Sequence, residues 1–294
     1  MSAMILYWSL SGSTKRVAEA IAGGLRAHGV ECALRDLRDG IPDDTGRYEI
    51  LGVGYPVHYY RPPDPVMRAI HALGRLDGRA VFAFCLAGTY RGAGMDSARA
   101  ALRGAGGTEI GAFACHGQGD FYPYVRLGWR FSPGHPNDRD LEEAQAFGAS
   151  LPKSQAGSRR AFSALSLPPA DPPTHPVYAV ERFLASPSLV RTLHYRFFRA
   201  DPDTCTRCGR CALRCPTHAI WWERGELPIW GPACMLCLTC VMTCPEQAVI
   251  CPLDWPILRP FLRWNVDRAL RDPALENERV ELRRGKVVKA GPPR

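Results

Sequence analysis

The chain has 294 residues, of which 46% are hydrophobic and 22% are charged, a balance and a length that fit a globular protein of two domains with connectors. Its formal net charge is +8, yet residues 1–150 carry 16 basic and 16 acidic side chains, whereas 151–200 carry 7 and 2 and 253–294 carry 10 and 6. Because the basic excess lies in a connector and a tail, the charge does not favour a nucleic-acid-binding protein.

The first half of the chain alternates strand and helix signals. Its opening apolar run has no basic leader, so we expect a buried strand there and not a secretory signal. Apolar runs of strand length predict strands at Ala3–Trp8, Glu49–Tyr55, Ala80–Leu86 and Ile110–Cys115, and weak alternation over Glu31–Leu37 predicts a strand that touches solvent. Amphipathic stretches predict helices at Thr14–Ala27, Asp64–Leu73, Ala93–Arg103 and Asp138–Leu151. This alternation predicts an α/β fold in which helices cover both faces of a parallel sheet.

Hydroxyl side chains gather between the first predicted strand and the first predicted helix, in the turn Ser-Leu-Ser-Gly-Ser-Thr over 9–14. The free N–H groups of a helix N-terminus favour a bound phosphate. The turn lacks the lysine of a nucleoside-triphosphate loop and the glycine pattern of a dinucleotide site. Taken alone, it is equally compatible with a helix cap that binds no ligand.

Two loops rich in glycine and aromatic residues follow the third and fourth predicted strands, at 54–60 and 87–92. Ligands of open α/β sheets bind at the carboxyl ends of the strands. The two loops are therefore placed to enclose a flat ring between them.

With these three loops, the segment resembles flavodoxin. The resemblance implies a doubly wound parallel sheet of order 2-1-3-4-5 and an FMN held without a covalent bond. It assigns the phosphate to Ser9, Ser11, Gly12, Ser13 and Thr14. It assigns the flanks of the isoalloxazine ring to Tyr55, Pro56, Val57, His58, Tyr59, Leu86, Ala87, Gly88, Thr89, Tyr90 and Gly92.

A long aromatic loop at 116–137 departs from the simple carrier pattern. Long loops in compact domains are usually functional. This loop is therefore expected either to cover the flavin or dock a partner, or only to pack its aromatic side chains on the surface.

A Pro- and Ser-rich linker follows over 152–175, and residues 176–199 are expected to form a helical connector. The tail, 253–294, contains a helix candidate at Ile257–Leu270 and a possible strand pair within Glu278–Val288. The predicted domains are thus a flavodoxin-like domain over 1–151, a connector over 152–199, a cluster domain over 200–252 and a basic extension over 253–294.

Eight of the twelve cysteines lie in two runs with the spacing C-x2-C-x2-C-x3-C-P, at 205–216 and 234–245. This is the spacing with which bacterial ferredoxins bind iron–sulfur clusters. Disulfides are disfavoured because nothing in the sequence points to export. Zinc ribbons are the nearer alternative, but they usually separate two C-x2-C pairs by a longer spacer. The remaining cysteines, Cys32, Cys85, Cys115 and Cys251, are expected to be small buried hydrophobic residues.

The cysteine runs resemble the small α+β domain of 2[4Fe–4S] ferredoxins. In that family the first three cysteines of one run share a cluster with the fourth cysteine of the other. The resemblance implies a first [4Fe–4S] cluster on Cys205, Cys208, Cys211 and Cys244. It implies a second cluster on Cys234, Cys237, Cys240 and Cys215.

The whole chain resembles the flavodoxin–ferredoxin fusion proteins of bacteria and archaea. The resemblance implies an electron-transfer protein in which FMN, a one- or two-electron group, is coupled to one-electron clusters between redox partners. An alternative is a cluster-fed flavin reductase acting on a small molecule such as a quinone or corrinoid. As an electron carrier the chain needs no acid, base or nucleophile of its own.

The expected partners are a redox donor and a redox acceptor, and neither nucleic acid nor a membrane-spanning segment is expected. The basic segments 152–199 and 253–294 are candidates for docking an acidic protein surface. With no apolar run of the roughly 20 residues that a membrane span needs, the expected location is the cytoplasm.

Overall fold

The computed structural model describes residues 1–156, 176–283 and 286–288, and most of the predicted linker lies outside these ranges. The chain forms two compact units. The first contains residues 1–118 and 134–175, and the second contains residues 119–133 and 176–294. The chain therefore passes from one unit to the other three times.

The first unit is built on a five-stranded sheet with the order β2-β1-β3-β4-β5, in which all neighbouring strands are parallel. This is the strand order of flavodoxin-like doubly wound folds, so the predicted fold class is confirmed. The strands are β1 (Ser2–Tyr7), β2 (Glu31–Asp36), β3 (Ile50–Pro56), β4 (Ala80–Ala87) and β5 (Thr108–His116). The helices of the unit are α1 (Ser13–Arg26), α2 (Asp64–Ala72), α3 (Gly94–Gly104) and α5 (Asp138–Ala156).

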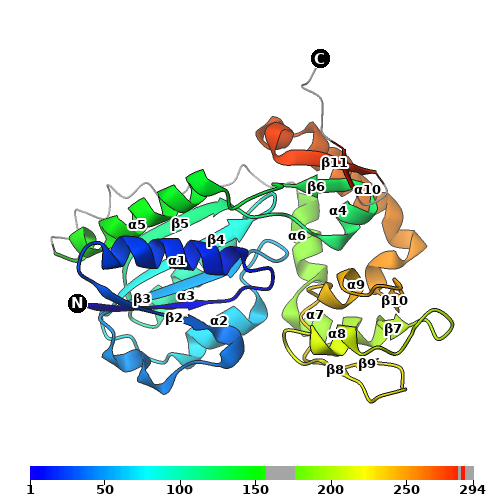
Figure 1. The fold of residues 1–294 in the computed structure, drawn as a ribbon, viewed down its shortest axis with the longest axis horizontal. Coiled ribbons are helices and arrows are strands. Elements are labelled where there is room, and N and C mark those ends of the chain that lie inside the picture. The colour runs from blue at the N-terminus through cyan, green and yellow to red at the C-terminus, as the bar shows by residue number, and fades with distance from the viewer. Residues whose placement is uncertain (157–175, 284–285, 289–294) are drawn as a thin grey trace. The chain divides into compact units, whose positions relative to one another are not determined.

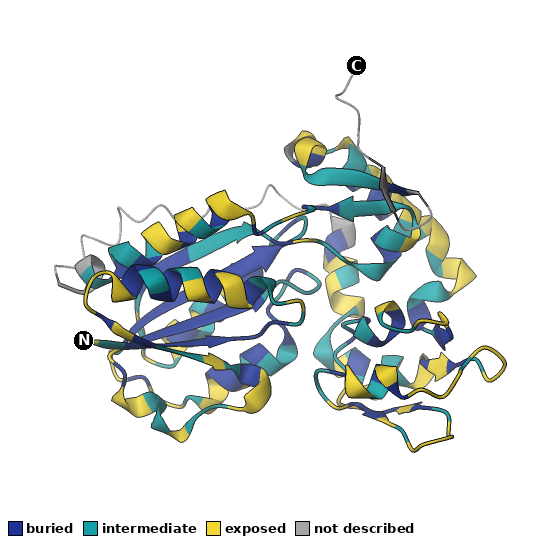
Figure 2. Ribbon diagram, in the orientation of Figure 1, coloured by how far each residue is buried: buried dark blue, intermediate teal, exposed yellow. Residues whose placement is uncertain are grey.

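Helices lie on both faces of this sheet, with α1 and α5 packed together on one face (Figure 1). All eight residues of the interior strand β4 are buried, and Figure 2 shows the interior strands of the sheet in the colour of buried residues. Continuous apolar runs are expected where helices cover both faces of a parallel sheet.

The α1–α5 contact depends on two glycines. A Cβ atom at Gly24 would lie 2.0 Å from the backbone oxygen of Gln145, and one at Gly148 would lie 2.1 Å from that of Ile21. The two helix backbones thus approach more closely than any larger residue would permit.

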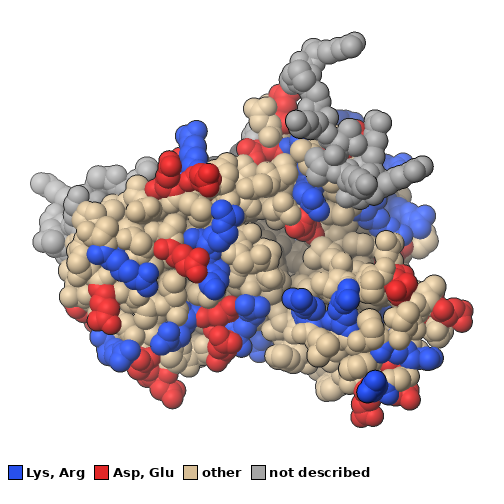
Figure 3. Space-filling view, in the orientation of Figure 1, with Lys and Arg blue, Asp and Glu red and all other residues tan. Residues whose placement is uncertain are grey.

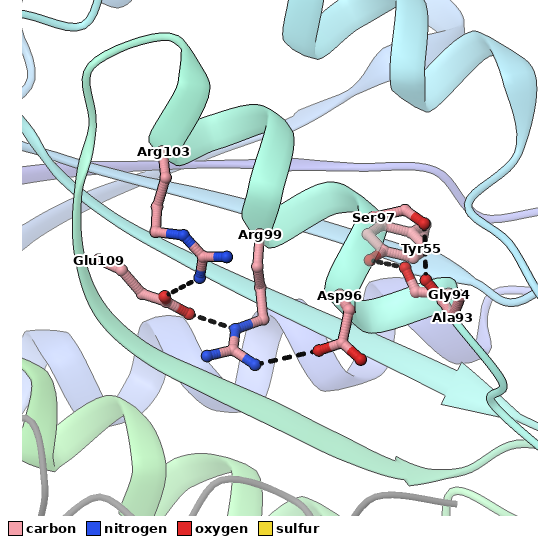
Figure 4. Close-up of polar contacts among 8 residues, drawn as sticks. All are labelled: Tyr55, Ala93, Gly94, Asp96, Ser97, Arg99, Arg103 and Glu109. Atoms are coloured by element: carbon pink, nitrogen blue, oxygen red, sulfur yellow. Dashed lines mark hydrogen bonds and ion pairs between the residues drawn. The ribbon is translucent and has the colours of Figure 1, made fainter. Parts of the chain in front are cut away.

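A polar network fixes α3 against the sheet (Figure 4). The Glu109 carboxylate on β5 pairs with Arg99 and, at 2.6 Å, with Arg103, both on α3. At the start of the helix, the buried Tyr55 hydroxyl donates to the Gly94 carbonyl at 3.0 Å. Burial raises the pKa of Tyr55 well above its ordinary value, so this hydroxyl stays protonated. These contacts position the loop between β4 and α3.

The second unit contains short elements around the cysteine runs and a C-terminal extension. Its helices are α4 (Tyr122–Arg126), α6 (Pro176–Leu184), α7 (Pro187–Thr192), α8 (Arg210–Leu213), α9 (Thr239–Met242) and α10 (Arg259–Arg271). Its strands are β6 (Trp129–Phe131), β7 (Arg199–Ala200), β8 (Ile220–Trp221), β9 (Ile229–Trp230), β10 (Val249–Ile250), β11 (Arg279–Arg283) and β12 (Lys286–Val288). The predicted tail helix and strand pair correspond to α10 and to the antiparallel β11–β12 pair.

The aromatic loop predicted at 116–137 contributes its central part to this second unit. Its strand β6 pairs antiparallel with β11 of the tail, giving a three-stranded sheet of order β12-β11-β6. Phe131 on β6 is fully buried, and its ring packs edge-on against Tyr124 of α4 with centroids 5.3 Å apart. These aromatic side chains therefore form part of a core.

In the described part of the chain, no helix combines the length and the apolar character needed to cross a bilayer.

Candidate functional site

The turn after β1 presents an uncapped helix N-terminus. No side chain caps α1, and the residue before it, Gly12, has φ +90°, a left-handed conformation that favours glycine. The Ser9 hydroxyl accepts a hydrogen bond from the Gly12 N–H at 3.1 Å, and Ser11 Oγ lies 3.1 Å from Ser13 Oγ. The first-turn N–H groups and these hydroxyls are thus brought together at the carboxyl edge of the sheet, as a phosphate site requires.

Trp8 lies directly before this turn. Its side chain is 2% exposed, and its indole N–H makes no hydrogen bond within the described residues. Its backbone N–H donates to the Gly54 carbonyl at 2.9 Å, which ties the turn to the end of β3. An orphaned buried donor beside the turn is compatible with a polar ligand there.

The two loops predicted to flank a ring contact each other. A Cβ atom at Gly92 would lie 2.7 Å from Tyr60 Cβ, and one at Gly94 would lie 3.0 Å from Val57 Cγ2. Tyr59 and Tyr60 form a tight turn with φ values of 49° and 62°. Backbone hydrogen bonds of 2.9 and 3.0 Å between His58 and Arg61 close that turn. Non-glycine residues in this region store strain, as is common at binding loops.

His58, in the same turn, is held neutral. Burial lowers the pKa of its imidazole from 6.5 to about 4. The residue as a whole is partly exposed, but Nδ1 is buried and makes no hydrogen bond within the described chain. At neutral pH the His58 ring is therefore uncharged and contributes no positive charge to this loop.

The eight motif cysteines line two separate cavities in the second unit. One is lined by Cys205, Cys208, Cys211 and Cys244, together with Ala200 and Val249. The other is lined by Cys215, Cys234, Cys237 and Cys240, together with Phe198 and Trp230. Each cavity thus takes three cysteines from one run and the fourth from the other. Within the described ranges, no three His, Cys, Asp or Glu side chains are placed to hold a single metal ion.

The two cysteine runs repeat the same backbone path. Left-handed φ values recur at matching positions: 55° at Arg207 and 58° at Leu236, and 50° at His218 and 52° at Gln247. The fourth cysteine of each run accepts a backbone N–H four residues on, at 3.2 Å for Cys215 and 3.3 Å for Cys244. The unit is therefore pseudo-symmetric about the two cavities.

The two cavities differ in environment. Cys208 is exposed, and the backbone N–H of Arg210 lowers the pKa of its thiol. Burial raises the pKa of Cys234 to about 12 and that of Cys240 well above its ordinary value. In the second cavity the Thr239 hydroxyl donates to Cys237 Sγ at 3.3 Å. In the first cavity burial raises the pKa of Cys211 to about 11. Buried thiols become thiolates only when a cation replaces their protons, so both cavities fit a positively charged metal core.

Three of the four cysteines outside the runs are buried and the fourth, Cys115, is half-buried. Burial raises the pKa of Cys32 and Cys251 to about 11. Cys32 and Cys251 therefore pack as neutral thiols, as expected for small buried hydrophobic residues.

Sequence reasoning missed one polar cluster at the carboxyl edge of the first unit. His135 Nδ1 lies 2.6 Å from the Asp140 carboxylate, and the rings of His135 and His116 meet edge-on with centroids 5.5 Å apart. Asp140 also accepts the Asn137 N–H at 2.7 Å, and its own N–H donates to Asn137 Oδ1 at 3.0 Å, which caps α5. The signal that the sequence offered for this helix cap was the spacing Asn-x-x-Asp at the start of a helical run, which is typical of reciprocal capping.

Residues 198–221 match the family model of the 4Fe-4S binding domain. The match contains all four cysteines of the first run, and the first unit has the flavodoxin strand order. The chain joins a flavodoxin-like domain to a ferredoxin-type domain. This combination supports an electron-transfer or redox role.

Similar proteins cover different shares of the chain. An uncharacterized protein of Methanocaldococcus jannaschii is 25% identical over 156 residues, which is 52% of this chain and 99% of that protein. The "Probable oxidoreductase YjgC" of Bacillus subtilis is 35% identical over 68 residues, which is 18% of this chain but only 7% of that protein. Among solved structures, the match to a flavodoxin from the domain Archaea spans 53% of this chain and 99% of the flavodoxin chain. The two are 22% identical over the match, with a TM-score of 0.43.

Proposed function

We propose that this chain is an electron-transfer protein that couples an FMN in the flavodoxin-like domain to two [4Fe–4S] clusters in the ferredoxin-type domain. The observation that carries the proposal is the pair of cavities, each lined by four cysteines drawn from both runs. Three thiolates from one run and one from the other is the ligand pattern of two-cluster ferredoxins.

In this proposal Cys205, Cys208, Cys211 and Cys244 bind the first cluster, and Cys215, Cys234, Cys237 and Cys240 bind the second. The left-handed residues of each run turn backbone N–H groups toward the sulfur atoms, as the bond from Ala219 to Cys215 illustrates. Such bonds hold the thiolates in place and offset their negative charge.

The FMN phosphate is assigned to Ser9, Ser11, Gly12, Ser13 and Thr14. In support, this turn offers uncapped N–H groups, free space at Gly12 and the buried indole N–H of Trp8. The loops at 55–59 and 86–92 would flank the ring. When bound, FMN exchanges one or two electrons and each cluster exchanges one. A chain that holds both therefore connects a two-electron partner to a one-electron partner.

The donor and the acceptor are proposed to be redox proteins of the cytoplasm. In support, none of the twelve cysteines forms a disulfide in the described part of the chain, as in proteins kept in a reducing compartment. The basic extension is proposed to contribute to docking an acidic partner.

The test begins with anaerobic purification and with measurement of iron, sulfide and flavin. We expect about eight irons per chain and one FMN. Zinc in place of iron, or the absence of flavin, would overturn the proposal.

Crossed ligation is then tested by EPR of single Cys→Ala variants. Cys215→Ala and Cys240→Ala should leave the same residual cluster spectrum, and Cys208→Ala and Cys244→Ala should leave the other. Cys251→Ala is the matched control, since this buried thiol lies outside both cavities. If Cys215→Ala instead shares its spectrum with Cys208→Ala, each run binds its own cluster.

A further inference from the structure

A third cavity lies in the second unit and contains none of the cysteines. It has a volume of about 430 Å³, within the range of roughly 300–1,000 Å³ that is typical of small-molecule sites. Its walls come from α4, from the turn at Leu253–Asp254 and from the first turns of α10. These helices lie side by side in Figure 1.

Most of the wall is apolar. The apolar residues that line the cavity are Pro123, Leu127, Leu253, Pro260 and Leu262. Such a wall favours a ligand with a hydrophobic ring or chain, because that surface is removed from water on binding.

The cavity lining contains three arginines but only one acidic residue. The Asp254 carboxylate is already engaged: Oδ1 pairs with Arg126 and accepts the Tyr122 hydroxyl at 3.1 Å, and Oδ2 accepts the Cys251 N–H at 3.0 Å. Arg126 therefore neutralises the one acidic group of the lining. The cavity keeps a surplus of positive charge from its other two arginines.

These two arginines, Arg259 and Arg263, are exposed on α10, four residues apart. Neither makes an ion pair within the described residues. Like charges at this spacing repel each other and destabilise a helix, and a bound anion would offset that repulsion. Figure 3 shows basic side chains gathered over α10 on the visible face.

We propose that this cavity binds an organic anion that joins an apolar ring or chain to a carboxylate or phosphate group. The apolar part lies against the leucine and proline wall, and the anionic group pairs with Arg259 and Arg263. The site is distinct from the proposed cofactor sites, because none of its lining residues is shared with the cysteine cavities or with the first unit.

The test uses the full-length chain purified anaerobically with its cofactors, and calorimetric titration with four probes. Naphthoate and naphthyl phosphate carry both features of the ligand, naphthalenemethanol lacks the charge, and inorganic phosphate lacks the ring. We expect one molecule of a naphthyl anion to bind per chain, and the tighter of the two anions identifies the head group. Naphthalenemethanol should bind at least about tenfold more weakly because it lacks the charge-assisted contact, and phosphate should do so because it buries no apolar ring.

Variants locate the binding. The double substitution Arg259→Gln/Arg263→Gln should weaken naphthyl anion binding by about tenfold or more. Arg271→Gln, on the same helix but outside the cavity lining, should change it by less than about twofold. Leu127→Trp should block binding without changing the charge, with iron content and thermal unfolding as checks that the variant is folded. The proposal is wrong if neither anion binds, if naphthalenemethanol binds as tightly as naphthoate, or if the double variant binds like the parent chain.

Discussion

At the scale of single residues, hydrogen bonds to the cysteine sulfurs affect how readily each cavity accepts negative charge. In the second cavity the Thr239 hydroxyl donates to Cys237 Sγ at 3.3 Å and the Leu236 N–H donates to Cys234 Sγ at 3.4 Å. A donor to a cluster sulfur stabilises the reduced, more negative state and raises the reduction potential.

Thr239→Val should therefore lower the reduction potential of the cluster that we propose for the second cavity. A net hydrogen bond of about 0.5–1.5 kcal/mol corresponds to a shift on the order of 20–60 mV for a one-electron couple. The measurement is an EPR-monitored redox titration. Thr243→Val is the matched control, because its hydroxyl donates to the Thr239 carbonyl at 2.8 Å and to no sulfur. Equal reduction potentials in the parent chain and in Thr239→Val would show that the Thr239 hydroxyl does not raise the potential of this cluster.

His58 should make the stability of the chain depend on pH. Folding lowers its pKa from 6.5 to about 4, so the folded chain binds fewer protons than the unfolded chain below about pH 6.5. The contribution of the neutral ring is fully present above that pH and is lost as the pH falls toward 4. Between about pH 7.5 and 5.5 we expect a loss of at most about 1.4 kcal/mol in the free energy of unfolding.

Denaturant unfolding of the parent chain and of His58→Gln at both pH values measures this effect. The glutamine variant should lose less stability than the parent chain over the same interval, because it has no proton to take up at this position. If the free energy of unfolding falls by the same amount in both proteins between the two pH values, His58 does not titrate as proposed.

At the scale of elements, the contact between α1 and α5 is set by backbone approach. Gly24→Ala would place a methyl group 2.0 Å from the Gln145 carbonyl oxygen. The helices would have to separate, at a cost on the order of 1–3 kcal/mol. The neighbouring Gly23 has no atom within 4 Å of its Cβ position.

Gly23→Ala is therefore the matched control. It should stabilise the chain by about 0.5–1 kcal/mol, because alanine favours a helix interior over glycine. Thermal unfolding of both variants tests the pair. Similar melting temperatures for the two variants would rule out a close α1–α5 contact at Gly24.

At the scale of the whole molecule, the central part of the 116–137 loop is joined to the C-terminal extension. The Leu282 N–H donates to the Gly128 carbonyl at 2.6 Å, and Tyr122 donates to Asp254. The second unit thus combines a segment from the middle of the flavodoxin-like half with the tail.

Ending the chain at Pro252 should expose this segment. Phe131 would lose its sheet partner, and residues 119–133 should be cleaved faster in limited proteolysis, because they would lack buried contacts. Iron content should be retained, since the cysteine cavities end at Val249. Unchanged cleavage within 119–133 would contradict a structural role for the tail.

The sequence by itself determined the features that depend on local patterns. Continuous apolar runs predicted the buried strands of the parallel sheet, because helices cover both of their faces, and weak alternation predicted the more exposed edge strand β2. The cysteine spacing indicated which eight residues would bind clusters, while the crossed ligand pattern came with the resemblance to two-cluster ferredoxins and stays a prediction. The hydroxyl-rich turn over 9–14 was also visible in the sequence, and α1 begins within it at Ser13.

The tertiary structure alone decided the features that depend on contacts between distant segments. The pairing of β6 with β11 and the cavity between α4 and α10 join residues from the middle and the end of the chain, and no local pattern encodes such contacts. The neutrality of His58 also required the structure, because desolvation depends on every segment packed around the ring. Spacing thus identified which residues could bind cofactors, and packing determined what surrounds them.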